Sequence, residues 1–247
     1  MWSKAKDIIG SDLDRFQEDL VRKAQDGSKD AIFKIARLYE QGLEIKQNDM
    51  KALKLFELCS EAGMIDAKIR LADNYFRGIG VTHDLEKAKD LLNSAILEKR
   101  IMAYILLGDI LSKEGKKLEA INSYLEAEKI FIKDSQRISD YTMAIMYAGL
   151  STLYLSEKEK IRNPELAIKY MDKALKEDVF CNAKAIGDMF FYGNGIEKDY
   201  ERAKFYYRRI AEEDTCDTCE CDCKDYCIDK LNSITAAEVW QMKTKGC

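Results

Sequence analysis

Five of the eight cysteines in this chain gather in one stretch near its C-terminus, Cys216-x-x-Cys219-x-Cys221-x-Cys223-x-x-x-Cys227. Steps of four residues place Cys219, Cys223 and Cys227 on one face of a helix, and Cys216 can add a fourth sulfur. Four thiolates in a tetrahedral arrangement suit zinc. We therefore expect Cys216, Cys219, Cys223 and Cys227 to be the candidate metal ligands, whereas Cys221 points elsewhere.

Two other interpretations of these cysteines stay open. In the first, the cysteines are small buried side chains of a closing helix and have no chemical role. In the second, they form local disulfides after export or purification. The density of cysteines in a chain without a recognisable secretion signal favours metal over a disulfide framework. The one-residue spacings and the intervening acids, however, match no zinc motif cleanly. Cys59, whose repeat equivalents are alanines, is expected to be a small core residue.

The remaining residues give little support for an enzymatic function. The chain has one histidine, His83, which removes most histidine-based triads and zinc proteases, and its place in a turn predicts a solvated side chain. The glycine pairs Gly78-x-Gly80 and Gly193-x-Gly195 follow helical patterns, whereas a dinucleotide fingerprint follows a strand. No nucleophile, base and oxyanion site assemble, so we expect a non-enzyme. A hydrolytic pair of carboxylates is a feature that sequence does not reveal.

The composition indicates which elements carry these residues. The 247 residues are 47% apolar and 34% charged, and they include one proline. Such a chain can bury a sizeable core, and it favours helices over an all-β architecture built from many turns. Lys and Arg number 40 against 44 Asp and Glu, a net charge of -4, so there is no basic excess of the kind that nucleic acids select.

The N-terminal residues favour a cytoplasmic location. Acidic residues come before any apolar stretch of signal-peptide length, and no run approaches the roughly 18 apolar residues of a membrane span. We expect a cytoplasmic protein without a membrane span, and export by a route without a recognisable signal stays open.

The chain repeats itself. Ala31–Gly42 aligns with Ala67–Gly78 when every landmark is shifted by 36 residues. Three further copies cover Ile101–Glu128, Tyr147–Ala174 and Ile186–Tyr207. Self-similarity at this period is typical of helical repeat proteins, in which each unit buries its apolar face against its neighbours.

Each copy predicts two helices joined by a turn. Apolar residues recur at steps of three and four in both halves of a copy. Glycines follow the first helix, at a position where a left-handed conformation is favoured. A short polar side chain precedes the second helix, where it can accept from the free N–H groups of the first turn. These capping residues are Asn48, Asp84, Asn163 and Asp199.

The pattern resembles the tetratricopeptide repeat, and copies one, two and five resemble its Sel1-like variant. The turn Gly78-Ile-Gly80-Val-Thr-His-Asp84-Leu-Glu-Lys-Ala88 carries that signature. The resemblance spans residues 28–212 and implies an all-α fold, an α-solenoid of about five helix-turn-helix repeats with helical caps. It also implies a scaffold or adaptor that binds a protein or peptide, without identifying the partner.

The two ends differ from the repeats and are expected to cap them. Residues 1–27 contribute an amphipathic helix at Asp12–Gly27, and residues 213–247 hold the cysteine-rich segment and a closing helix at Lys224–Met242. The closing helix is expected to face the last repeat with Leu231, Ile234, Val239 and Trp240. Between copies three and four, Lys129–Met143 is longer than the repeat requires and predicts an extended helix end or a loop.

In the resembled family the first helix of each pair lines the concave face. The resemblance therefore implies a binding surface made of Lys34, Arg37, Gln41, Arg70, Asp73, Arg77, Asp109, Ser112, Lys113, Thr152, Lys184, Asp188 and Tyr192. Four of the first six are basic, which favours an acidic peptide or a C-terminal carboxylate as partner. An ordinary solvated face is the open alternative.

A second functional alternative rests on the cysteines. In it the cysteine-rich segment is a thiol-based metal-binding or redox-responsive module, and the helical repeats are its platform. No cofactor is required by the scaffold interpretation, and zinc is the one candidate for the cysteine-rich segment.

Overall fold

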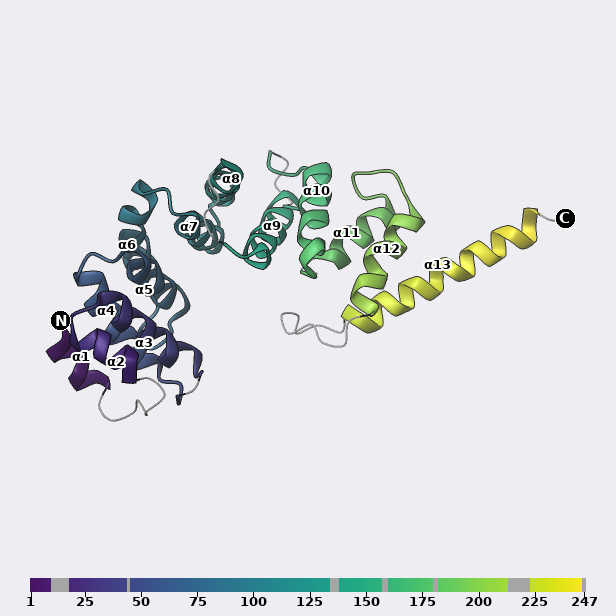
Figure 1. Ribbon diagram of the computed structural model, residues 1–247. Helices are drawn as coiled ribbons and strands as arrows, with labels where there is room; N and C mark the ends of the chain where they lie inside the picture. Colours follow the sequence, from purple (N-terminus) through teal and green to yellow (C-terminus); the bar gives the residue numbers. More distant parts are fainter. Residues whose placement is uncertain are drawn as a thin grey trace. The chain divides into compact units, whose positions relative to one another are not determined.

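The computed structural model describes residues 1–9, 18–43, 45–133, 138–156, 160–179, 182–212 and 223–245, and all regular structure in these ranges is helical (Figure 1). The chain divides into two compact units, Met1–Asp134 and Ser135–Cys247, called unit 1 and unit 2 below. The predicted all-α fold is confirmed. No helix in the described ranges combines the length and the apolar character that crossing a membrane requires.

Unit 1 begins with two short helices and continues with three helix pairs. The short helices are α1 (Trp2–Ile9) and α2 (Glu18–Gln25). The pairs are α3 (Lys29–Gln41) with α4 (Asp49–Glu61), α5 (Ile65–Arg77) with α6 (Leu85–Leu97), and α7 (Ile101–Lys113) with α8 (Lys117–Lys133). The helices of a pair contact each other, and α4 contacts α5 as α6 contacts α7. Each pair therefore buries its apolar side against its own partner and the next pair.

Unit 2 has two helix pairs and a long last helix. The pairs are α9 (Asp140–Tyr154) with α10 (Pro164–Ala174) and α11 (Ala183–Tyr192) with α12 (Tyr200–Ala211). A 3₁₀ turn, η2 (Leu175–Glu177), extends α10, and α13 (Cys223–Lys245) packs against α12. With the three pairs of unit 1, the described residues contain the five predicted helix pairs.

The turn between the helices of a pair is built from local chemistry. The side chains of Asn48, Asp84, Asn163 and Asp199 each accept a hydrogen bond from the backbone N–H three residues later, as an N-cap does. The backbone of the capping residue also bonds back to the first helix; Asp84 N–H, for example, donates to the Tyr75 carbonyl at 3.0 Å. The predicted capping role of these four residues is confirmed.

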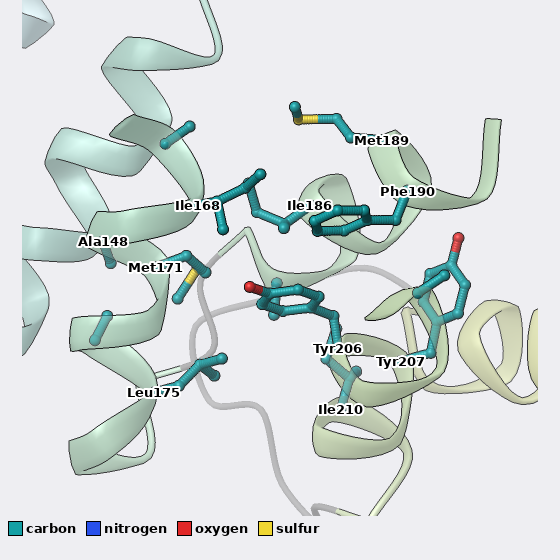
Figure 2. Packing of buried hydrophobic residues seen from close by; sticks show 14 of the residues in the cluster. Ala148, Ile168, Met171, Leu175, Ile186, Met189, Phe190, Tyr206, Tyr207 and Ile210 are labelled. Atoms are coloured by element: carbon teal, nitrogen blue, oxygen red, sulfur yellow. The ribbon is translucent and has the colours of Figure 1, made fainter. Parts of the chain in front are cut away.

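Aromatic rings and aliphatic side chains from every helix of unit 2 form one core. Figure 2 shows the part of this core that α9, α10, α11 and α12 contribute. The rings of Phe190 and Tyr206 lie nearly parallel with centroids 5.9 Å apart. Ile234 of α13 joins this core with 1% exposure, and Leu231 packs at its edge. The predicted closing helix therefore exists and covers the last repeat with two of its four expected residues. The side chains of Val239 and Trp240 lie outside the described part of the chain.

Glycine creates room for a tyrosine ring at two equivalent places in the repeats. A Cβ on Gly108 would lie 2.4 Å from the ring of Tyr124, and one on Gly187 would lie 2.6 Å from the ring of Tyr207. In the α5/α6 pair the equivalent positions hold alanine and leucine, and both are buried in one core. A glycine on the first helix thus lies against a tyrosine on the second, whereas the larger alanine lies against the smaller leucine. The space between the two helices stays filled in both cases, as close packing requires.

The N-terminal cap starts earlier than predicted. Helix α1, which the sequence pattern did not predict, buries Ala5 and Ile9 and contacts α4. The carbonyl of Ile9 accepts hydrogen bonds from the Tyr39 hydroxyl at 3.1 Å and from Lys51 Nζ at 3.2 Å. Of the helix predicted at residues 12–27, the structure describes α2, and residues 10–17 lie outside the described ranges.

The stretch between copies three and four contains the boundary between the units. Helix α8 extends to Lys133, which agrees with the extended helix end, one of the two predicted alternatives, and α9 begins at Asp140. Residues 134–137 lie outside the described ranges. Cys59 is completely buried in the core of unit 1, as predicted.

Candidate protein-binding surface

The first helices of the pairs in unit 1 carry nine of the predicted binding residues, and we call eight of them, all except Ser112, the first-helix face. They are Lys34, Arg37, Gln41, Arg70, Asp73, Arg77, Asp109 and Lys113. They lie on α3, α5 and α7. The contacts among them show which neighbours the fold brings together and how their charges are balanced.

Two arginines from neighbouring repeats share one carboxylate. Glu40 lies 2.9 Å from Arg37 Nε and 3.8 Å from a terminal nitrogen of Arg70. Burial and the charge of Arg70 lower the pKa of Arg37, whereas Glu40 raises it. Two guanidinium groups therefore face one acidic group, and a positive charge remains in excess at this junction between α3 and α5. Glu40, which the repeat pattern does not predict for the surface, is therefore part of this junction.

Arg77 and Asp73 form a pair within α5, with 2.7 Å between Nε and a carboxylate oxygen. Both act on Asp109 of α7, because the charge of Arg77 lowers the pKa of Asp109 and that of Asp73 raises it. Burial dominates and raises the pKa of Asp109 to about 6. The carboxylate accepts from the Tyr124 hydroxyl at 2.5 Å, so it is held by the partner helix α8.

Lys113 reaches back to the turn of the preceding pair. Its ammonium lies 3.2 Å from His83 Nε2 and 5.1 Å from the centre of the Phe76 ring. Lys34 and Gln41 are exposed on α3. Contacts thus link α3 to α5 and α5 to α7 among these residues and their neighbours, and some of the basic residues are paired with acids of the same chain.

In unit 2 the corresponding residues of α11 are engaged by α13. Lys184 Nζ lies 3.2 Å from Asp188 and 3.9 Å from the centre of the Tyr226 ring. Asp188 accepts from the hydroxyls of Tyr207 at 2.7 Å and Tyr226 at 2.8 Å. This carboxylate is therefore a structural acceptor that joins α11 to α12 and α13.

Tyr192 of α11 is also contacted by α13. The ammonium of Lys230 donates to its hydroxyl at 2.6 Å and lies 4.7 Å from the centre of the Phe191 ring. This contact lowers the pKa of Tyr192 because the ammonium favours the phenolate. Sequence reasoning placed a closing helix over the last repeat but missed Tyr226 and Lys230, since the register between two helices is not visible in a local pattern.

The two remaining residues of the predicted surface are Thr152 on α9 and Ser112 on α7. Thr152 donates to the Ala148 carbonyl at 2.8 Å and receives a hydrogen bond from the Asn182 side-chain amide. Ser112 is half-buried on the last turn of α7.

The predicted metal ligands are only partly described. Cys216 and Cys219 lie outside the described ranges, and Cys223 is the first residue of α13 with its side chain outside the description. Cys227 is completely buried against the core of unit 2, and burial raises the pKa of its thiol to about 11. Among the described residues no group of three or more potential metal ligands occurs. The zinc site at Cys216, Cys219, Cys223 and Cys227 stays a prediction.

Comparison with known proteins relates the repeats to one family. A family model described as Sel1 repeat matches residues 29–64, 65–98, 140–179 and 184–214, which is more than half of the chain. The matched ranges skip α7 and α8, the copy that lacks the longer loop in the sequence. The fourth copy, for which the sequence pattern does not predict the Sel1-like form, is also matched.

Two solved structures share the fold. A Sel1 repeat protein from Oxalobacter formigenes is 19% identical, with a TM-score of 0.59 over 87% of this chain and 85% of that chain. A protective antigen present in uropathogenic Escherichia coli strains, which displays an SLR fold, is 20% identical, with a TM-score of 0.51 over 85% of this chain and 52% of that one.

An uncharacterized protein of Neisseria meningitidis serogroup B is 28% identical over 158 residues. The match covers 64% of this chain and 31% of that protein, so the chain spans about a third of the relative's length.

Proposed function

Because this chain belongs to the Sel1 repeat family, we propose that it is a non-catalytic scaffold that binds a protein or peptide on the first-helix face of unit 1. Proteins of this family are commonly scaffolds for protein–protein interaction. The repeats also supply a surface made of side chains from several helices, which is the kind of surface that helical repeat proteins use for binding.

The junction of Arg37, Glu40 and Arg70 is the observation that carries the proposal. A guanidinium group presents paired donors that match a carboxylate, and one of the two groups here lacks a full acidic partner. The side chains of this junction are 22–33% exposed, and an ion pair that solvent reaches contributes little stability, so a carboxylate from a partner can compete for either arginine. The proposed partner is therefore an acidic segment or a C-terminal carboxylate.

The test is partner capture with a triple variant. Arg37→Ala, Arg70→Ala and Arg77→Ala together should reduce capture of the partner from an extract of the native organism by at least tenfold. The melting temperature should change little, because surface substitutions usually alter stability by less than about 0.5 kcal/mol each. Capture is measured by quantitative mass spectrometry of proteins retained on the immobilised chain.

A matched control removes three positive charges elsewhere in unit 1. Lys54, Lys129 and Lys133 are exposed on α4 and α8, and their replacement by alanine should leave capture unchanged. Equal loss in both triple variants would mean that overall charge rather than the first-helix face retains the partner. Full capture by the arginine variant would move the binding surface away from this face.

A further inference from the structure

A second surface lies in unit 2 between the second helices of its two pairs, α10 and α12. Two adjoining pockets there, of about 310 and 430 Å³, are both lined by Asp172 and Arg202. We call this surface the basic groove and define it by Lys169, Asp172, Lys173, Lys176, Arg202 and Phe205. None of these residues belongs to the first-helix face or to the α11 residues that α13 engages.

The groove concentrates positive charge in a chain whose net charge is -4. Lys169 and Lys173 lie on α10 and Lys176 lies on its 3₁₀ extension η2, and steps of four and three residues place all three on one side of this helical stretch. Lys169 and Lys176 are exposed, and within the described ranges neither forms an ion pair. Two of the three lysines are therefore available to an external anion.

The opposite wall, formed by α12, is held in place by aromatic contacts. The guanidinium of Arg202 lies 4.2 Å from the centre of the Phe190 ring. Asp172, an acid in the groove, accepts from the Tyr206 hydroxyl at 2.5 Å. The residues that line the pockets include four cations and two acids, Asp172 and Glu165. Positive charge is therefore in excess, and Asp172 already accepts a hydrogen bond within the chain.

The groove also offers one apolar contact. Phe205 is 52% exposed beside the cations, and its ring meets that of Tyr206 edge to face at 5.2 Å. An exposed ring held against a buried one is a rigid anchor for an apolar side chain, because it loses little conformational freedom on binding. Cations around such an anchor match a peptide with both acidic and apolar side chains.

We propose that the basic groove binds an acidic peptide segment that carries an apolar side chain. The carboxylates contact Lys169, Lys176 and Arg202, and the apolar side chain packs on Phe205. The two acids in the groove disfavour a continuous run of phosphates, so nucleic acid fits it less well than a peptide. This binding is independent of the first-helix face, and the whole chain then holds two separate protein-binding surfaces.

The test uses a synthetic probe and the full chain. The probe is a fluorescein-labelled peptide of alternating aspartate and glutamate with a central phenylalanine, and its binding is followed by anisotropy at low and moderate salt. Lys169→Glu with Lys176→Glu should weaken binding by about tenfold or more, since reversed charges repel the peptide. Phe205→Ala should weaken it several-fold while leaving the salt dependence almost unchanged. Circular dichroism melting checks that both variants stay folded.

The control is Lys160→Glu with Lys198→Glu, two exposed lysines of unit 2 that do not line the pockets. This variant should bind the probe like the unaltered chain. The proposal is overturned if the control loses as much affinity as the groove variant, or if the probe does not bind at all. It is equally overturned if single-stranded RNA of the same charge competes better than the unlabelled peptide.

The triple arginine variant of unit 1 distinguishes this proposal from the proposed function. Replacing Arg37, Arg70 and Arg77 by alanine should leave binding of the probe unchanged. Loss of probe binding in that variant would assign the peptide to unit 1, contradict the groove and leave the proposed function standing.

Discussion

Replacing Gly108 with alanine should lower the free energy of unfolding by about 2–3 kcal/mol, since forcing extra atoms into a packed core costs about this much. The added methyl group would lie 2.4 Å from the ring of Tyr124. That ring cannot move away easily, because its hydroxyl is bonded to Asp109 at 2.5 Å. The measurement is the urea midpoint and slope, followed by far-ultraviolet circular dichroism.

A double-mutant cycle identifies the cause. Gly108→Ala combined with Tyr124→Leu copies the alanine and leucine that occupy the equivalent positions of α5 and α6. The two substitutions should show a favourable coupling of about 1 kcal/mol or more, because the smaller side chain removes the clash. Recovery stays partial, since Asp109 loses the donor that it has in Tyr124. An unchanged midpoint for Gly108→Ala, or zero coupling, would show that the ring does not depend on the missing Cβ.

Deleting residues 1–27 should leave the first repeat exposed and cost about 3–5 kcal/mol, on the basis of about 1.5–3 kcal/mol for each large apolar side chain returned to water. Ile9 is 3% exposed in the cap, and Tyr39 and Ile32 beneath it are almost completely buried. Aggregation on size-exclusion chromatography and a lower melting temperature are the expected results, because a repeat without its neighbour presents an apolar patch to solvent.

A single and a double variant test whether the buried side chains of α1 are what stabilises the first repeat. Ala5 is completely buried, so Ala5→Asp should reproduce part of the loss by placing an unpaired charge in the core. Lys4→Ala with Asp7→Ala alters exposed residues of the same helix and should have little effect. A deletion variant that remains monomeric with an unchanged melting curve would refute the capping role.

The features that the sequence predicted well are local. An N-cap residue such as Asp84 and a left-handed glycine such as Gly78 act on backbone groups within a few residues, so their spacing is visible in the chain. The repeat period adds the pairing of neighbouring helices, because every copy has the same two partners. These signals were sufficient for the fold and for the positions of the first-helix residues.

The features that the sequence missed depend on contacts between distant helices. Helix α1 has eight residues, and among its described side chains Ala5 and Ile9 are the buried ones, which is too few for a clear periodic pattern. The engagement of Tyr192 by Lys230 depends on the register of α13 against α11. The charge balance around Arg37 depends on Glu40, one turn further along α3 and pointed at the next repeat. None of these is encoded in residue spacing.

Hydrogen exchange of the chain with and without its captured partner tests whether the first-helix face of unit 1 binds that partner. Exchange should become slower in peptides from α3, α5 and α7, centred on Arg37, Arg70 and Arg77, because bound side chains suppress local opening of these helices. Helices α4, α6 and α8 should change much less. Protection confined to those second helices, or to unit 2 alone, would contradict binding on the first-helix face.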